Sequence, residues 1–292
     1  MEYCEYPLHA WSHYRHFLRS QCPRKAWLYY QEARKGADPQ ESTPEARIVH
    51  GLRRRITLEQ YISRMFDREI RKIFYTPDDG DISLETLSNT LNSKFDRELE
   101  LMLGGIPAKD HNLYMLKEFE NKNCNLSHLI SQAGNLISQY CHAAEKELWK
   151  LICDTPPVCR REIAAPLTVH INELCCYCAP LLALERNGVL WIVENNCRDT
   201  SVLLHKFYAV NTLGREPHLV RSFAYCRENG NFQEAGLDLN VSETLRQISE
   251  DGALWSDLLA MPRQNVPSNT GHCPDCEFNF FCNQYRKTEI TR

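Results

Sequence analysis

Three cysteines close together near the end of the chain constrain its fold more than any other feature. They lie in His272-Cys273-Pro274-Asp275-Cys276-Glu277-Phe278-Asn279-Phe280-Phe281-Cys282, with two residues between the first pair and five between the second. A tight turn lets both sulfurs of a Cys-x-x-Cys motif face one point, so the spacing is typical of ligands to one metal centre. Three ligands are one short of a closed tetrahedral set. We predict that the fourth is Cys22, in Gln21-Cys22-Pro23-Arg24-Lys25.

The chain has 14 cysteines among 292 residues. Whether they form disulfides, bind metal or pack as thiols depends on the cellular compartment. Its first residues do not combine a charged start with an apolar stretch, and no apolar run could cross a bilayer. We therefore expect a cytoplasmic protein without a membrane partner, in which cysteines bind metal or pack as thiols instead of forming disulfides. The remaining cysteines, including Cys176 and Cys178 on an expected core strand, are predicted to be packing residues.

The pattern along the chain predicts helices followed by a small sheet. Helices are expected at 9–35, 47–75 and 84–153, the last with a break near Gly104, and later at 201–213 and 241–260. Strands are expected at 161–171, 176–185, 189–194 and 219–226. Asn187-Gly188, between two of these strands, is a strong hairpin signal. Helices around a small central sheet predict an α/β or α+β fold.

Two segments carry a resemblance to a known family. A helix ending in FLRSQCPRKAWLYY, followed much later by CPDCEFNFFC, resembles the RecB-like nucleases of the PD-(D/E)XK class that carry an iron–sulfur cluster. These include CRISPR-associated exonucleases and the nuclease domains of AddB-like helicase–nucleases. The resemblance implies a restriction-endonuclease-like core in one domain, 1–292, with a mainly helical part (1–155), a sheet part (156–260) and a cysteine tail (261–292).

The same resemblance implies a cofactor. In this family one N-terminal and three C-terminal cysteines hold a 4Fe-4S cluster, which here corresponds to Cys22, Cys273, Cys276 and Cys282. A four-cysteine zinc site is the alternative, because Zn²⁺ also accepts four thiolates. A lone Cys-x-x-Cys is also compatible with a redox pair.

The family's catalytic positions are only partly present. Its pattern has a helix histidine, an Asp at the start of a strand, an (Asp/Glu)-x-Lys on the next strand, and a Gln and a Tyr on a later helix. Glu194 matches the motif carboxylate and Tyr208 the tyrosine, whereas Leu181 and Asn196 replace the expected Asp and Lys. Leucine cannot ligate a metal and asparagine cannot carry a positive charge.

The remaining family positions are less specific. Asp67 falls at the histidine position, with His50 as the alternative. Leu204 or His205 falls near the glutamine. Neighbouring carboxylates that could substitute for missing ligands are Glu162, Glu173, Glu185 and Asp199.

Basic residues cluster in the N-terminal helices although the net charge is −4. Expected DNA contacts are Arg24, Lys25, Arg53, Arg54, Arg55, Arg64 and Arg68, and Arg15 and Arg71 lie in the same helices. Proteins that bind single-stranded DNA without sequence preference use basic side chains to contact the phosphates and aromatic side chains to stack on the bases.

Three functions are compatible with these patterns. The first is a catalytically impaired nuclease-fold protein that binds DNA, single-stranded by preference, and a protein partner in a DNA-processing, defence or repair complex. The second is an active exonuclease in which Asp67 and Glu194 help hold Mg²⁺ or Mn²⁺. The third is an iron–sulfur structural or redox-sensing module without nucleic acid.

Overall fold

The structure, a computed structural model, describes residues 9–38, 40, 42–76, 83–104, 114–120, 124–163, 166–274 and 276–282. Its helices are α1 (His13–Gln21), α2 (Pro23–Trp27), α3 (Ala33–Lys35), α4 (Pro44–Arg53), α5 (Leu58–Tyr75), α6 (Leu84–Leu103), α7 (Leu126–Lys146), α8 (Leu148–Asp154), α9 (Asp199–Leu213) and α10 (Val241–Ala260). Its strands are β1 (Arg55–Ile56), β2 (Met115–Leu116), β3 (Leu167–Ile171), β4 (Leu174–Cys178), β5 (Leu182–Arg186), β6 (Val189–Asn195), β7 (Val220–Tyr225) and β8 (Phe232–Ala235). None of the helices in these ranges has the length and apolarity needed to cross a membrane.

A four-stranded mixed sheet, in the order β5-β6-β7-β8, lies at the centre. Strands β5 and β6 form an antiparallel hairpin, and β7 and β8 form another. Asn187 and Gly188 turn the first hairpin with φ angles of 52° and 78°, which confirms the hairpin prediction. Strands β6 and β7 are parallel, and α9 is the connection between them.

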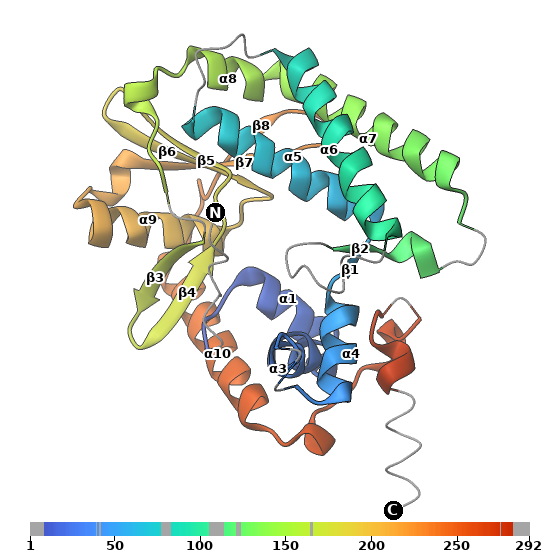
Figure 1. Ribbon diagram of the computed structural model, residues 1–292. Helices are drawn as coiled ribbons and strands as arrows, with labels where there is room; N and C mark the ends of the chain where they lie inside the picture. The colour runs from blue at the N-terminus through green and yellow to red at the C-terminus, as the bar shows by residue number, and fades with distance from the viewer. Residues whose placement is uncertain are drawn as a thin grey trace, which may run out of the picture.

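Helices cover both faces of this sheet (Figure 1). Leu182, Leu184 and Val193 share one buried cluster with α5, α6, α7 and α8. Ala183 and Ile192, which point the other way, share a second cluster with α9 and the β3–β4 hairpin. Burial on both faces explains why β6 is apolar along most of its length. The predicted mixed α/β class is confirmed.

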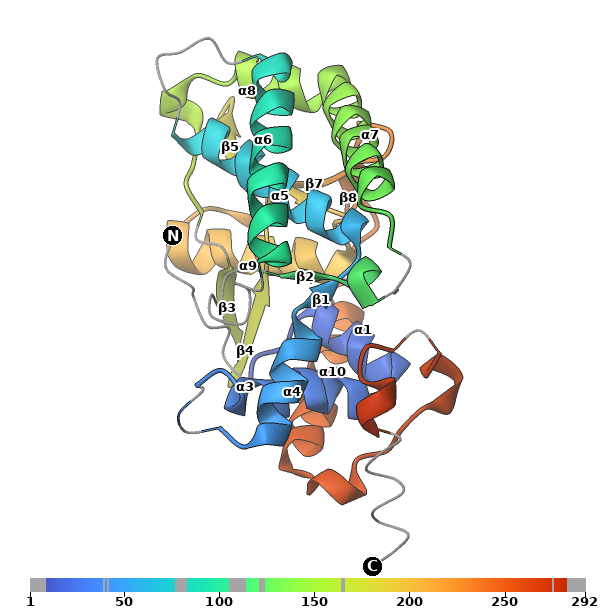
Figure 2. The same cartoon turned by 45° about the vertical axis from the view of Figure 1, so that its right-hand side comes forward.

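The N-terminal helices, α10 and the cysteine tail form a second group below the sheet (Figures 1 and 2). Leu18, Val49, Trp255 and Phe278 meet in its buried core, although they are far apart in the sequence. The segment before α1 connects the group to β4, because the Trp11 amide donates to the Cys175 carbonyl at 2.7 Å. Both views show the red tail beside the blue N-terminal helices.

Several expected elements are divided in the structure, among them the helix expected at 84–153, which becomes α6, β2, α7 and α8. The helix expected at 9–35 breaks at Cys22, which is extended because Pro23 follows it. The helix expected at 47–75 becomes α4, β1 and α5, because Thr57 and Gln60 form a capping box that starts α5. The strand expected at 176–185 becomes β4 and β5, separated at Pro180, which cannot donate a ladder hydrogen bond.

The β7–β8 hairpin provides a sharp test of this packing. Gly230 has a φ of +76°, and a Cβ there would lie 1.8 Å from the Ala143 carbonyl oxygen on α7. Gly188 has a similar φ of +78° but open space around it. We expect Gly230→Ala to lower the free energy of unfolding by roughly 3 kcal/mol and Gly188→Ala by about 1 kcal/mol. Urea denaturation measures both, and equal losses would contradict the close approach of the hairpin to α7.

Candidate functional site

Four cysteines line one small pocket between the N-terminal helices and the tail. They are Cys22, Cys273, Cys276 and Cys282, the residues that the sequence predicted as one ligand set. All four are free thiols in this structure. Arg24, Lys25, Asn269 and other tail residues complete the lining. The fold thus brings the cysteines of two segments about 250 residues apart in the chain to one pocket.

Local hydrogen bonds position each side of this pocket. Pro23 begins α2 and leaves Cys22 extended at the junction with α1. In the tail, the Cys276 amide donates to the Cys273 carbonyl at 3.2 Å, the tight turn expected of Cys-x-x-Cys. The Cys282 amide donates to the Phe278 carbonyl at 2.8 Å.

Other bonds fasten the two segments to one another. The Asn269 amide donates to Cys22 Sγ at 3.4 Å, and Asn269 Nδ2 donates to the Gln21 carbonyl at 3.0 Å. The Arg24 guanidinium donates twice to the Val266 carbonyl, at 3.0 and 2.8 Å. Lys25 pairs with Glu277 at 3.0 Å. The pocket is therefore held by contacts beyond its cysteines.

Two of the four thiols, Cys276 and Cys282, favour the neutral form when no cation is bound. Burial raises the pKa of Cys282 to about 11, and the nearby Cys276 thiol adds to the effect. Burial also raises the pKa of Cys276. Metal ligation requires thiolates, so binding at this pocket would release protons and would supply the compensating charge.

No three sulfurs of this pocket form a close group. Among the described residues, the only group of three Cys, His, Asp or Glu side chains whose ligand atoms all lie within 4.8 Å of one another is elsewhere in the fold. No three of the pocket's sulfurs are therefore that close. A single tetrahedral Zn²⁺ with bonds of about 2.3 Å requires sulfurs about 3.8 Å apart.

Glu194 and Leu181 are neighbours across two strands. Glu194 is near the end of β6, and the Leu181 amide, just before β5, donates to the Val193 carbonyl at 2.7 Å. Leu181 is buried in the apolar core. The neighbours of Glu194 that offer a possible metal-ligand atom are Cys178 and His205, so the structure does not pair it with a second carboxylate in any close group within the described ranges.

Asp67 lies beside the end of β6 but its carboxylate is already bound. Arg227 donates to both of its oxygens, at 2.9 and 2.8 Å, and Asn195 Nδ2 donates at 2.9 Å. Burial raises the pKa of Asp67, and the Arg227 charge opposes that shift. The structure thus gives Asp67 an ion-pair partner instead of placing it with Glu194.

The other family positions are dispersed. Asn196 is exposed in the turn after β6, with a φ of 54° that asparagine tolerates. Tyr208 packs against the buried cluster beneath α9. His50 Nδ1 contacts the Ala33 carbonyl at 2.9 Å. Leu204 is buried in the α9 cluster.

The carboxylates considered as substitutes form no close group of three with Glu194 within the described ranges. Glu185 pairs with Arg161 and with Arg215, the latter at 2.8 Å, and these two arginines lower its pKa. Glu162, Glu173 and Asp199 are exposed.

Several of the basic residues make contacts within the protein. Arg15 is buried and cannot face DNA, whereas the half-buried Arg71 donates to the Leu181 and Ile163 carbonyls at 3.2 Å each. Arg68 pairs with Glu98 at 3.2 Å. Arg53 lies 4.8 Å from the ring centre of Tyr29, and Arg64 lies 4.6 Å from that of Tyr114. Arg54 and Arg55 follow α4, with Arg55 in β1.

Sequence reasoning assigned no metal role to Cys178 or His205. Cys178 is correctly predicted as buried, and His205 was considered only as a counterpart of the family's glutamine. Both lie against Glu194, where His205 Nε2 is 3.4 Å from Glu194 Oε2. Burial raises the pKa of Cys178, and the Glu194 charge adds to this. The spacing of 178, 194 and 205 follows no ligand motif, so no local signal could have revealed the group.

Comparisons with known proteins leave the family open. No protein-family model, no curated protein and no solved structure matched this chain. A functional proposal therefore depends on the geometry described above and on the resemblance of the cysteine segments.

Proposed function

We propose that this chain is a RecB-like nuclease-fold protein that holds a 4Fe-4S cluster and binds DNA without cleaving it, as a subunit of a DNA-processing, defence or repair complex. The observation that carries the proposal is the single pocket lined by Cys22, Cys273, Cys276 and Cys282. Four thiols from both ends of a long segment meet there, as the resemblance implies.

The spacing of the sulfurs favours the cluster over zinc. A 4Fe-4S cluster separates its ligand sulfurs because each binds a different iron atom, whereas one Zn²⁺ draws all four together. The absence of a close three-sulfur group among the described residues fits the wider arrangement. When bound, the cluster would cross-link α1 and α2 to the tail. The hydrogen bonds from Asn269 and Arg24 already pre-form that junction.

The order of elements supports the nuclease-like core. The family's motifs occur on a helix, two consecutive strands and a later helix. Here α5, β5, β6 and α9 follow in that order around one sheet. Leu181 lies just before β5 and Glu194 near the end of the adjacent β6, close to where that family places its two carboxylates.

Impaired catalysis follows from what surrounds Glu194. Hydrolysis of a phosphodiester by this class needs a divalent metal held by carboxylates. Leu181 offers no ligand atom, Asn196 no positive charge, and Asp67 is bound to Arg227. A hard oxygen-rich site for Mg²⁺ or Mn²⁺ is not assembled by these residues.

A patch of aromatic and basic side chains supports DNA binding. Tyr14 is 47% exposed, and its ring lies 6.1 Å from that of Tyr29, over which Arg53 is stacked. Phe17 is also exposed on the same helix as Tyr14. Stacking surfaces beside guanidinium groups suit single strands, because every base offers a π-face and every nucleotide a phosphate. We assign DNA contact to this patch and to the adjacent Arg54 and Arg55.

A cleavage and retention assay tests the proposal. The protein, purified without oxygen, is incubated with end-labelled single- and double-stranded DNA, with Mg²⁺, with Mn²⁺ and with chelator. We expect no metal-dependent cleavage and a retained single strand whose binding weakens steeply with salt, because phosphate contacts release counterions. Glu194→Ala is run in parallel to identify contaminating nucleases.

Two results would contradict the proposal in different ways. Cleavage that Glu194→Ala abolishes would establish an active nuclease with relocated ligands. Failure to retain any DNA at low salt would favour a structural or redox module.

A further inference from the structure

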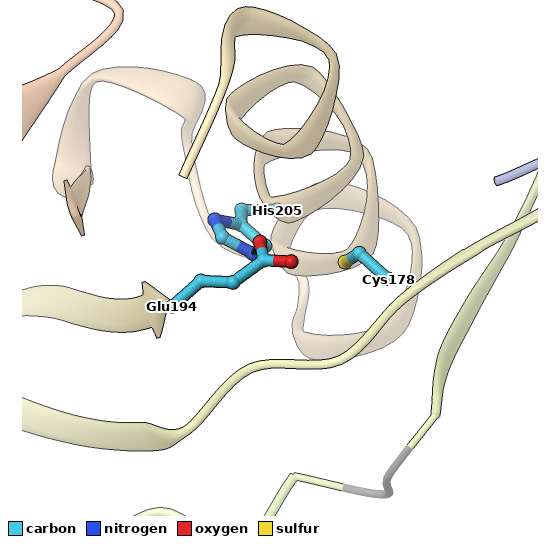
Figure 3. A group of neighbouring side chains, drawn as sticks. All are labelled: Cys178, Glu194 and His205. Carbon is cyan, nitrogen blue, oxygen red and sulfur yellow. Dashed lines mark ion pairs between the residues drawn. The ribbon is translucent and has the colours of Figure 1, made fainter. Parts of the chain in front are cut away.

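Three side chains from three separate elements converge beside the central sheet (Figure 3). Cys178 ends β4, Glu194 is near the end of β6, and His205 is on α9. Their ligand atoms all lie within 4.8 Å of one another. Cys178 and His205 are buried and the Glu194 side chain is 15% exposed, so the group lies just beneath the surface.

His205 is oriented as a metal-ligating histidine would be. Its ring is fully buried, and Nδ1 contacts Ser222 Oγ on β7 at 2.9 Å. A ligating imidazole normally uses its second nitrogen for such a bond, which fixes the tautomer and directs the other nitrogen at the ion. Here Nε2 is the nitrogen directed at Glu194.

The facing atoms lack ordinary hydrogen bonds. Apart from their own contact at 3.4 Å, neither His205 Nε2 nor Glu194 Oε2, both buried, has a hydrogen-bond partner among the described residues. Leaving a buried polar atom unsatisfied is costly, and such atoms in native structures call for an explanation such as a bound ion. A cation between the two atoms and the Cys178 sulfur would satisfy all three.

We propose that Cys178, Glu194 and His205 bind one transition-metal ion, with Zn²⁺ as the preferred ion, at a site separate from the four-cysteine pocket. Sulfur, imidazole nitrogen and carboxylate are the donors that Zn²⁺ accepts, whereas Mg²⁺ and Ca²⁺ select oxygen donors. Three protein donors leave one tetrahedral position for water or for another ligand. The inference goes beyond the proposed function, since it depends on this geometry and not on the nuclease resemblance.

His13 is the candidate for that remaining position. Its Nε2 is buried without a hydrogen-bond partner within the described part of the chain, and its ring is near enough to Glu194 for an electrostatic interaction, although it lies outside the close group of three. A His13→Ala variant therefore distinguishes a three-donor site from a four-donor site.

Metal content and a cobalt probe test the proposal on the full chain. Zinc, iron and sulfide per chain are measured after anaerobic purification and equilibration with Zn²⁺. Separately, Co²⁺ is added to chelator-treated protein and difference spectra are recorded. We expect one zinc ion per chain, and with Co²⁺ a thiolate-to-cobalt charge-transfer band and the visible bands of a tetrahedral site. Cys178→Ser and Glu194→Gln should weaken Zn²⁺ binding by roughly 100-fold, and Cys178→Ser should abolish the charge-transfer band.

Matched controls separate this site from the other pocket and from misfolding. Cys176→Ser changes a buried thiol two residues away on β4 and should keep both zinc and the band. Iron and sulfide content should not change in Cys178→Ser, which shows that the chain has folded around its other centre. The proposal is overturned if wild-type protein binds no Zn²⁺ or Co²⁺, if Cys178→Ser binds them as wild type does, or if zinc is lost only with Cys276→Ser.

Discussion

Cys276→Ser is expected to lose its iron and sulfide and to have a free energy of unfolding lower by roughly 5 kcal/mol. A cluster on Cys22, Cys273, Cys276 and Cys282 closes a loop of about 250 residues. In the chain-entropy model, a cross-link over such a loop stabilises the folded state by about that amount. Loss of one of four ligands removes the cross-link, and it also leaves the remaining buried thiols without a centre.

Iron and sulfide analysis with anaerobic denaturation measures this effect. Cys22→Ser should match Cys276→Ser, although it changes the opposite end of the loop. Cys153→Ser is the control, because Cys153 is an exposed free thiol on α8, and it should keep full iron content and lose less than about 0.5 kcal/mol. A Cys276→Ser protein with wild-type iron and sulfide would refute the ligand assignment. Tightly bound zinc in place of iron in the wild type would favour the zinc alternative.

Arg15→Ala is expected to lower the free energy of unfolding by about 4 kcal/mol. The Arg15 side chain is fully buried and donates to the Ala10 carbonyl. Its guanidinium lies 4.5, 5.1 and 5.4 Å from the ring centres of Tyr30, Tyr177 and Trp255. Truncation would leave a cavity where α1, the π-helical segment Leu28–Glu32, β4 and α10 meet. It would also remove desolvated cation–π contacts worth about 1–2 kcal/mol each at most.

Two further variants test whether the lower free energy of unfolding comes from the buried Arg15 side chain and its charge. Arg47→Ala, on an exposed position of α4, should cost less than about 0.5 kcal/mol. Arg15→Met fills most of the space without the charge and should cost about 2 kcal/mol, between the two alanine variants. Chemical denaturation of the iron-loaded protein measures all three. An Arg15→Ala protein as stable as Arg47→Ala would show that the buried guanidinium does not stabilise the fold.

Local chemistry made part of this structure predictable. The helix expected at 241–260 has those bounds in the structure, because its apolar positions recur with the helical period and Asn240 caps it. Asn187-Gly188 forms its hairpin because both residues tolerate positive φ. Where predictions were wrong, a capping or proline effect at Cys22, Thr57 or Pro180 outweighed the continuous apolar pattern.

The candidate sites also differ in whether local sequence spacing could predict them. The tail cysteines lie within ten residues of one another, so their spacing alone indicated a common centre. Arg15 and Arg71 looked like surface cations, because periodicity does not show that a guanidinium is enclosed by aromatic rings or carbonyl groups. The ion pair of Asp67 with Arg227 joins residues 160 positions apart, and no window of sequence contains both.

By itself, the sequence determined the local elements, the mixed α/β class and the cysteine motif of the tail, because backbone preferences and short ligand spacings act over a few residues. Only the tertiary structure decided that Asp67 pairs with Arg227 and that Cys178 and His205 face Glu194. These contacts depend on how the helices and strands, among them α9, β4 and β6, pack around a shared core. That packing is set by the burial of many side chains together, and no single segment encodes it.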